Sequence, residues 1–324
     1  MNIIEVKKLT KKFNGLTAVN GISFTVKKGE IFGFLGPNGA GKSTTIGMLS
    51  TLINSTAGQA LINGFSVEDD TDEVRKSIGL VFQDPSLDDR LTAKENLVFH
   101  ARLYGVARQE YVKRVKEVLE LVELWDRKDS LVRSFSGGMK RRLEIARGLI
   151  HYPKVLFLDE PTLGLDPQTR VHIWDYILKL RAAHRMTIFM TTHYMNEAEF
   201  CDRIAIIDRG KIVALDTPAK LKKKVGGDII QLQSQENDQL KKEIKERYKL
   251  KVKTESEKLL IEVPDGEKFL PRLFNELDAR IDSIELRKPT LEDVFLKLTG
   301  RKIREEEASA KDHLRQAVRM RRRR

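Results

Sequence analysis

Apolar residues along roughly the first two thirds of the chain follow two patterns. The runs Val155–Leu158 and Ile188–Met190 are short, almost wholly apolar and followed by polar residues. Strands buried on both faces of a parallel sheet have this pattern, and ligands bind at their carboxyl ends. The stretch Glu110–Glu123 instead carries apolar residues at helical spacing. Together the patterns predict an α/β core within residues 1–222, with an inserted helical subdomain at about residues 88–150.

Strands are also expected nearer the N-terminus. Ile3–Lys7 and Ile22–Val26 are strand-like runs, and Ile31–Leu35 ends in a glycine-rich turn. Ala60–Ile62 comes directly before Asn63-Gly64, a pair that favours a tight hairpin turn because both residues adopt positive φ easily. The sequence therefore predicts a β-hairpin at this point of the chain.

A change in composition after Gly226-Gly227 indicates a second, small α+β domain, expected to cover residues 223–300. Its strand-like and helix-like runs follow the order β-α-β-β-α-β, the ferredoxin-like pattern. The six runs are Ile229–Leu232, Asp238–Tyr248, Lys249–Thr254, Lys258–Val263, Glu267–Leu277 and Ile281–Leu286. A last helix begins at Thr290, where Asp293 is placed to complete a capping box. Its apolar face either packs on its own domain or docks on, or regulates, a partner subunit.

Composition narrows the class of protein. Of the 324 residues, 40% are hydrophobic and 33% are charged, which is too apolar a mixture for a wholly disordered chain. No uncharged apolar run approaches the roughly 18 residues that a membrane-spanning helix needs, and the first residues contain no stretch long enough for a secretory signal. Because Cys201 is the only cysteine, no internal disulfide can form, which suits a reducing, cytoplasmic setting.

The net charge of +12 is unevenly distributed. Residues 301–324 carry ten basic and four acidic side chains, a net charge of +6, so half of the excess lies in this segment. The charge therefore does not indicate a nucleic-acid-binding face on the folded body, and no specific nucleic-acid partner is expected. The segment is expected to be a basic, mobile tail. It either stays solvated or contacts anionic lipid, at about 1 kcal/mol per basic residue near the surface.

A glycine-rich segment after the strand Ile31–Leu35 matches the phosphate-binding pattern G-x-x-x-x-G-K-[ST]. Its residues are Gly36, Pro37, Asn38, Gly39, Ala40, Gly41, Lys42, Ser43 and Thr44. Glycines let the main chain curl so that successive N–H groups point at phosphate oxygens, and the N-terminus of the next helix adds a favourable dipole. Lys42 then reaches the β- and γ-phosphates of ATP, and the Ser43 hydroxyl binds Mg²⁺. The G-x-G-x-x-G spacing of dinucleotide-binding proteins is absent here.

Two adjacent carboxylates follow the apolar run Val155–Leu158. Asp159 is placed to bind Mg²⁺, directly or through a water molecule. Glu160 is placed to orient and polarise the water that attacks the terminal phosphate. An acidic strand end is common by itself, but beside a phosphate-binding loop it predicts a hydrolytic site.

A third segment narrows the class further. Residues Ser134-Phe135-Ser136-Gly137-Gly138-Met139-Lys140-Arg141-Arg142 resemble the signature sequence of ATP-binding-cassette (ABC) ATPases. The other family elements occur in the expected order, as Phe13, the Q-loop glutamine Gln83, the D-loop Leu163-Gly164-Leu165-Asp166 and the switch histidine His193. The resemblance covers roughly residues 3–220. It implies a P-loop NTPase cassette with a RecA-like core, an antiparallel β-subdomain and a helical subdomain.

The resemblance also implies roles for three isolated residues. Phe13 would stack on adenine, Gln83 would join the Mg²⁺ shell, and His193 would hydrogen-bond the γ-phosphate and position the attacking water. Without the family pattern, Phe13 would be interpreted as a core aromatic residue, Gln83 as a loop glutamine, and His193 as a polar group with an ordinary hydrogen-bond partner.

The resemblance implies that the signature residues function only in a homodimer. By the same resemblance, Ser136, Gly137 and Gly138 would complete the ATP site of a second copy, so that ATP joins two cassettes and hydrolysis releases them. Phe135 and Met139 stand where the family usually has leucine and glutamine. The serine and the two glycines, which would make the phosphate contacts, are kept.

The segment Arg287–Gly300 resembles the terminal motif of the daunorubicin/doxorubicin-resistance type of efflux ATPases. That resemblance implies the ATP-hydrolysing motor subunit of an ABC-2 type exporter, bound peripherally at the cytoplasmic face of the cell membrane to a separate six-helix permease. The alternative is a soluble, non-transport ABC ATPase that acts on nucleic acid, ribosomes or protein complexes. Such proteins usually carry two cassettes or a long coiled-coil insertion. This sequence shows neither feature, which favours transport.

Overall fold

The chain is described by a computed structural model that covers residues 1–83, 86–255, 257–277 and 279–300. The expected basic tail lies outside these residues. Two compact units divide between Asp216 and Thr217. The division comes a few residues before the expected boundary at 222/223, because helix α8 (Pro218–Val225) packs against α11 (Leu291–Thr299), the last helix of the second unit.

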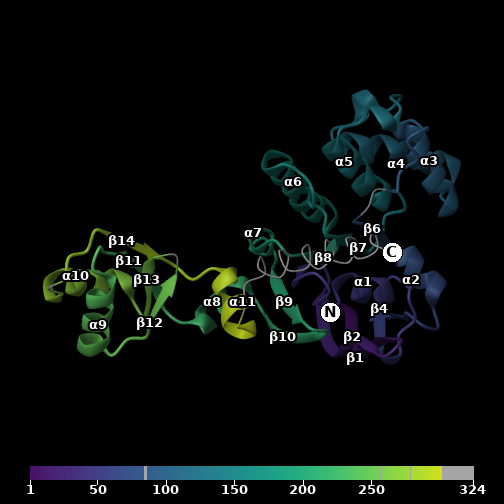
Figure 1. Ribbon diagram of the computed structural model, residues 1–324. Coiled ribbons are helices and arrows are strands. Elements are labelled where there is room, and N and C mark those ends of the chain that lie inside the picture. The colour runs from purple at the N-terminus through teal and green to yellow at the C-terminus, as the bar shows by residue number, and fades with distance from the viewer. Residues whose placement is uncertain (84–85, 256, 278, 301–324) are drawn as a thin grey trace, which may run out of the picture. The chain divides into compact units, whose positions relative to one another are not determined.

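A six-stranded sheet forms the centre of the first unit, and its strand order is β10-β9-β3-β8-β7-β6 (Figure 1). Its strands are β3 (Ile31–Leu35), β6 (Ile78–Val81), β7 (Val155–Asp159), β8 (Thr187–Thr192), β9 (Arg203–Asp208) and β10 (Lys211–Asp216). Neighbouring strands pair in parallel except at one edge, where β10 runs antiparallel to β9.

Successive residues of the parallel strands enter two separate cores, one on each face of the sheet. In β3, Ile31 belongs to one core and Phe32 to the other, and in β7 the same division separates Leu156 from Phe157. Burial on both faces explains why these strands are nearly unbroken apolar runs. The second core contains a cluster of phenylalanine rings, formed by Phe24, Phe32, Phe34, Phe157 and Phe189.

An antiparallel sheet with the order β2-β1-β4-β5 shares this second core. Its strands are β1 (Asn2–Phe13), β2 (Leu16–Lys27), β4 (Ala57–Ile62) and β5 (Phe65–Ser66). The expected hairpin is present, since β4 and β5 pair across Asn63 and Gly64, whose φ angles are 53° and 86°. Helix α1 (Lys42–Leu49) lies between the two sheets, and Ile46, Met48 and Leu49 enter the shared core.

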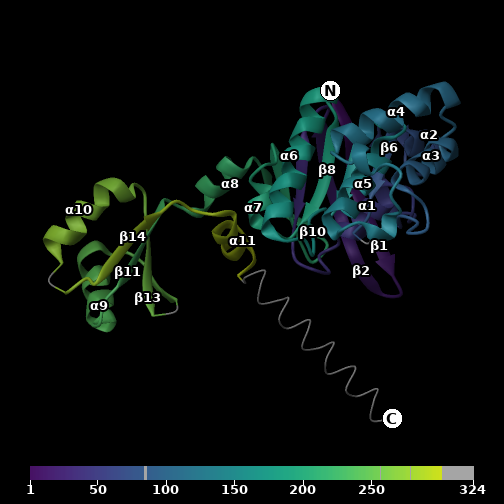
Figure 2. The same cartoon turned by 90° about the horizontal axis from the view of Figure 1, so that it is seen from above.

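Helices cover the other face of the parallel sheet. The long helices there are α3 (Ala93–Leu103), α4 (Arg108–Leu121), α5 (Gly137–Leu149) and α6 (Pro167–His184). Helices α3, α4 and α5 stand together as a helical lobe, which Figure 2 shows from above. The short helices are α2 (Thr71–Ser77), α7 (Met195–Ala198) and the 3-10 turns Trp125–Arg127 and Val132–Ser134.

The second unit contains an antiparallel sheet with helices α9 and α10 packed on one face. Its elements are β11 (Asp228–Gln233), α9 (Asn237–Tyr248), β12 (Val252–Glu255), β13 (Lys258–Val263), α10 (Gly266–Glu276) and β14 (Ser283–Arg287). The strands lie in the sheet in the order β12-β13-β11-β14, and the elements follow one another along the chain as β-α-β-β-α-β. The capping box of α11 is formed by Thr290 and Asp293, and Gly300 ends the helix with a φ of 76°.

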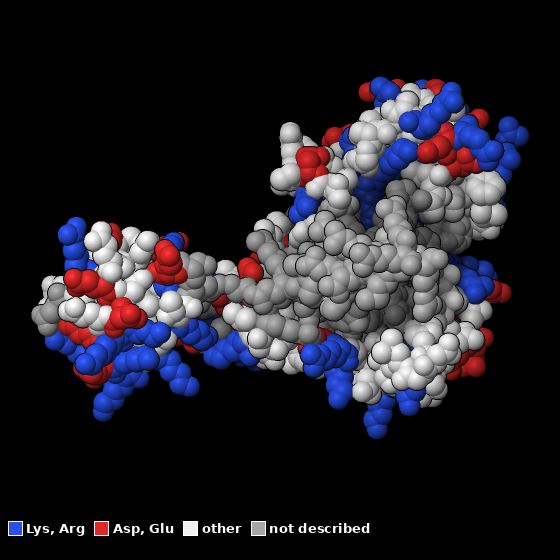
Figure 3. Space-filling model, viewed as in Figure 1, with Lys and Arg blue, Asp and Glu red and all other residues white. Residues whose placement is uncertain are grey.

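The surface of the described chain carries both signs of charge. On the face in Figure 3, basic and acidic side chains are interspersed over both units. Among the residues that the structure describes, no helix is long and apolar enough to cross a bilayer.

Candidate functional site

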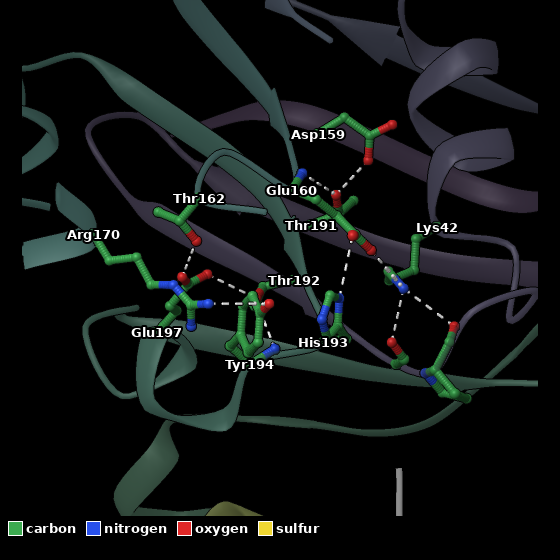
Figure 4. Close-up of polar contacts among 12 residues, drawn as sticks. Lys42, Asp159, Glu160, Thr162, Arg170, Thr191, Thr192, His193, Tyr194 and Glu197 are labelled. Carbon is green, nitrogen blue, oxygen red and sulfur yellow. Dashed lines mark hydrogen bonds and ion pairs between the residues drawn. The ribbon is translucent and has the colours of Figure 1, made fainter. Parts of the chain in front are cut away.

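Three segments that follow neighbouring parallel strands meet at one edge of the central sheet. Strands β3, β8 and β7 are adjacent, with Leu35 paired to Thr192 and Asp159 paired to Thr191. Because parallel strands end at the same edge, the glycine-rich loop after β3, the acidic end of β7 and the residue after β8 come together (Figure 4).

The loop between β3 and α1 has a shape that side chains at two of its glycines would block. A Cβ on Gly36 would lie 2.3 Å from the carbonyl oxygen of Ile207, and one on Gly41 would lie 2.6 Å from that of Ala18. Gly41 also has a φ of 106°, in the left-handed region that favours glycine. It stands directly before α1, whose first N–H groups have no partner within the helix. Main-chain donors and the helix dipole therefore act at the same place, which suits a phosphate.

Lys42 is the first residue of α1 and is only 5% exposed. Its ammonium group donates hydrogen bonds to the carbonyl oxygens of Gly36 (2.8 Å) and Pro37 (3.1 Å). It also forms an ion pair with Oε1 of Glu160 at 3.1 Å. The lysine therefore bridges the phosphate-binding loop and the acidic strand end.

Glu160 has a φ of 47°, which is unusual for its residue type and typical of strained functional positions. Its N–H donates to Oγ1 of Thr191 at 3.0 Å, and its Oε2 lies 3.1 Å from Nδ1 of His193. Burial disfavours the charged carboxylate, but the hydrogen bond with His193 and the charge of Lys42 outweigh burial and lower the pKa of Glu160. The carboxylate is therefore ionised at neutral pH, as a general base must be. Lys42, Glu160 and His193 are called the Glu160 cluster below.

Two side-chain oxygens beside the Glu160 cluster suit a magnesium ion. Asp159 is the last residue of β7 and accepts a hydrogen bond from Oγ1 of Thr191, and Ser43 follows Lys42 with its side chain exposed. The described residues contain no group of three or more metal-ligating side chains. Mg²⁺, however, usually takes only one or two protein ligands and completes its shell with phosphate oxygens and water. Asp159 and Ser43 therefore fit this ion together with a nucleotide.

Two predicted site residues stand outside the Glu160 cluster. Phe13 ends β1 and is 42% exposed, with Nζ of Lys11 4.9 Å from its ring centre. Gln83 follows β6 and is exposed.

The signature residues also lie apart from the Glu160 cluster, at the N-terminus of α5. Ser136 caps this helix by accepting a hydrogen bond from the N–H of Met139 at 3.3 Å, and Gly137 is exposed. A Cβ on Gly138 would meet the side chain of Thr169 at 2.6 Å, so this glycine allows α5 to pack closely on α6. The structure of one chain therefore brings together the phosphate-binding loop, Asp159, Glu160 and His193, but not the signature.

A buried charge network links α5 to the segments that contain Phe82, Ser86 and Asp159. The sequence pattern did not indicate this network. Glu144 is fully buried between Arg141 and Arg147 of the same helix. Arg147 also donates to the carbonyl oxygen and the hydroxyl of Ser86. The Arg141 guanidinium donates to the carbonyl oxygens of Phe82, Asp159 and Pro161. Charged residues at i, i+3 and i+6 usually form an exposed helix face, so only the tertiary structure shows this network.

A phosphate-binding loop, a glutamate paired with a histidine, and a capped helix beginning at Gly137 define a P-loop ATPase of the ATP-binding-cassette class. The family model described as ABC transporter matches residues 19–163, and the model described as ATP-binding protein DrrA1-3-like, C-terminal domain, matches residues 217–299. The chain belongs to the family of ABC transporter ATP-binding proteins, in the branch that includes the daunorubicin/doxorubicin resistance ATP-binding proteins. It is an ATP-binding, ATP-hydrolysing transport subunit.

Several curated relatives match along nearly their whole length. The linearmycin resistance ATP-binding protein LnrL of Bacillus subtilis is 42% identical over 94% of this chain and 100% of its own. The Nod factor export ATP-binding protein I of Burkholderia lata is 40% identical over 93% of this chain and 98% of its own. The daunorubicin/doxorubicin resistance ATP-binding protein DrrA of Streptomyces peucetius is 37% identical over 92% of both chains.

Solved structures show the same cassette. A dimeric ATP-binding cassette in a post-hydrolysis state, bound to ADP and Pi, matches with a TM-score of 0.59 and 31% identity over 66% of this chain and 98% of its own. The protein cbiO1 of Clostridium perfringens, part of the ABC transporter complex cbiONQ, matches with a TM-score of 0.64 and 28% identity over 76% of this chain and 95% of its own.

Proposed function

We propose that a homodimer of this chain binds Mg²⁺ and ATP at its interface and that hydrolysis drives export through a separate permease at the cytoplasmic face of the membrane. The Glu160 cluster carries this proposal, because it places a cation for phosphate beside an ionised base. Relatives named for linearmycin resistance, Nod factor export and daunorubicin/doxorubicin resistance support export, and drug efflux is proposed on this ground. They do not favour a soluble, non-transport ATPase.

In the proposed reaction the chain holds the γ-phosphate in place and activates the attacking water. The N–H groups of the loop and the Lys42 ammonium would bind the β- and γ-phosphates. When Lys42 turns to the phosphates, Oε1 of Glu160 becomes available to accept a proton from water, while His193 on Oε2 would position the γ-phosphate. A bound Mg²⁺, held by Ser43 and Asp159, would neutralise charge on the phosphate oxygens.

The two exposed residues have proposed roles at the edge of this site. Phe13 presents an accessible ring at the end of β1, which supports stacking on adenine, an interaction worth about 1–3 kcal/mol. Gln83 follows β6 at the same edge of the sheet as Asp159, which supports a place in the Mg²⁺ shell once nucleotide is bound.

The exposed start of α5 supports a nucleotide-dependent dimer. Its Ser136 hydroxyl and the N–H groups after it form an anion-binding helix N-terminus, and the hydroxyl accepts its hydrogen bond from Met139 within the same helix. A second copy that presented this helix to the γ-phosphate would complete the site. The solved relative bound to ADP and Pi is a dimer.

A carboxylate placed at the start of α5 should prevent this dimer without unfolding the chain. A Cβ on Gly137 would have only Leu165 Cδ2 near it, at 3.9 Å, so Gly137→Glu has room for its side chain. Its charge would repel the γ-phosphate across the interface. Sedimentation with Mg²⁺ and a non-hydrolysable ATP analogue should show a dimer for the wild type and for the exposed control Gln109→Glu, but a monomer for Gly137→Glu. A dimer of Gly137→Glu would contradict the proposed interface.

A groove on the first unit supports the permease as partner. It has a volume of about 650 Å³ and lies between the helical lobe and the end of α1. Leu52 and Leu103 line it with 57% and 66% of their surfaces exposed, and Phe82 and Tyr104 also line it. Since Gln83 follows Phe82, a permease helix seated in this groove would contact the segment that leads to the ATP site. A hollow that is lined by both apolar and charged side chains fits an amphipathic helix.

Charges placed in the groove should separate the chain from its permease. The double variant Leu52→Asp, Leu103→Asp should bind ATP normally but co-purify with the permease at least about tenfold less well, because apolar anchors at the centre of an interface contribute most of its affinity. Val112→Asp is the matched control, since Val112 is 61% exposed on α4 and does not line the groove. If the groove variant co-purified as well as the control, the docking surface would lie elsewhere.

A further inference from the structure

A buried carboxylate beside the Glu160 cluster bonds threonine side chains from the two segments that carry Glu160 and His193 (Figure 4). Glu197 on α7 is only 5% exposed. One of its oxygens accepts a hydrogen bond from the hydroxyl of Thr162, and the other from the hydroxyl of Thr192 at 2.7 Å. Thr162 lies two residues after Glu160, and Thr192 directly precedes His193. A single side chain therefore bridges the two segments that carry the reactive groups.

Arg170 on α6 makes a second bridge between the same two segments. Its Nε donates to the carbonyl oxygen of Leu165 at 3.0 Å, and its Nη2 donates to the hydroxyl of Tyr194 at 3.3 Å. Its guanidinium carbon also lies 4.1 Å from the centre of the Tyr194 ring. Leu165 belongs to the D-loop, residues 163–166, and Tyr194 follows His193. Arg170 thus joins the D-loop to the histidine segment, while Glu197 joins Thr162, just before the D-loop, to the same segment.

We infer that Glu197 and Arg170 are positioning residues, which hold residues 162–166 and 192–194 as one body so that the glutamate and histidine of the Glu160 cluster stay aligned during hydrolysis. The inference rests on the proposed function of that cluster. Both carboxylate oxygens of Glu197 accept hydrogen bonds from these two threonines, so Glu197 acts on the two segments through them. A contact made by a second copy on the D-loop would be passed to the histidine segment through Arg170.

Burial explains why the bridge depends on the carboxylate. Thr162 and Thr192 are each 1% exposed, so water cannot readily replace an acceptor that their hydroxyls lose. Burial also raises the pKa of Glu197, although the two threonine hydrogen bonds partly offset that rise. Removing the side chain would leave two buried hydroxyls without their acceptor, and the segments would move to find others.

The test measures turnover and binding separately in the full chain with its permease. Glu197→Ala should lower kcat between about 10- and 100-fold, the effect of misplacing catalytic groups by a fraction of an ångström to an ångström. The affinity for a non-hydrolysable ATP analogue should change less than about twofold, because the phosphate-binding loop is untouched. Asn196→Ala, an exposed neighbour on α7, should match the wild type in both. Glu197→Gln, which keeps one oxygen acceptor, should recover part of kcat.

A double-mutant cycle distinguishes positioning from general loss of structure. If Glu197 acts through the histidine, Glu197→Ala should reduce kcat much less in a His193→Ala background than in the wild type. Full reductions in both backgrounds, an unchanged kcat, or a parallel loss of ATP affinity would each overturn the inference. A wild-type complex without ATPase activity would instead refute the proposed function, so the two failures are distinguishable.

Discussion

Glu160→Gln should reduce ATP turnover by about 10²–10⁴-fold, the usual contribution of a general base, while leaving ATP binding intact. The amide matches the carboxylate in size, so the left-handed main chain at this position and the N–H bond to Thr191 need not change. It has no negative charge and cannot take a proton from water. The pKa of the wild-type carboxylate is lowered by the hydrogen bond with His193 and the charge of Lys42, which outweigh burial. This low pKa keeps the base ionised at neutral pH, and the variant removes that state.

Single-turnover kinetics would measure the rate of ATP hydrolysis, and an equilibrium titration would measure the affinity for ATP. With Mg²⁺ and ATP, the variant should also remain a dimer for longer than the wild type, because the nucleotide that joins the two copies is not cleaved. Glu199→Gln is the control, since it removes an exposed carboxylate of the same unit. Turnover in Glu160→Gln equal to that of Glu199→Gln would remove Glu160 from its assigned role.

Lys42→Ala should act at the earlier step and weaken ATP binding itself. A hydrogen-bonded ion pair with phosphate is worth about 1.5–3 kcal/mol, so the dissociation constant for ATP should rise by about 10- to 150-fold. The side chain also bonds the Gly36 and Pro37 carbonyl oxygens and Oε1 of Glu160. Without it the buried carboxylate loses the charge of Lys42, and its pKa should rise.

Equilibrium titration with a fluorescent ATP analogue tests Lys42 directly. Lys28→Ala removes an exposed lysine of the same unit and should bind the analogue as the wild type does. An unchanged affinity for Lys42→Ala would show that the phosphates are held elsewhere. The two variants also check each other: Glu160→Gln should lose turnover but keep binding, whereas Lys42→Ala should lose binding first.

Local patterns were sufficient to find the elements that carry the site. The apolar run at 155–158 is β7, the glycine-rich loop does lead into a helix at Lys42, and the capping box at Thr290 begins α11. The expected hairpin at Asn63-Gly64 is also present. Each of these features depends on residues close together in the sequence, because turns, caps and the burial of a short strand follow from local conformation and apolar spacing.

Which residues far apart in the sequence come into contact could be determined only from the folded structure. Glu160 meets Lys42 and His193 only because β3, β8 and β7 are neighbours in the sheet, and strand order is not encoded in any local pattern. The same holds for Glu144 and Glu197, which are buried although glutamate usually faces solvent. Glu197 bonds threonines from two other segments. Glu144 pairs with arginines of its own helix, and this side of the helix is buried only because the chain packs over it. Spacing along the chain thus identified the chemistry of ATP hydrolysis, whereas the packing of distant segments determined which charges are buried and how they are aligned.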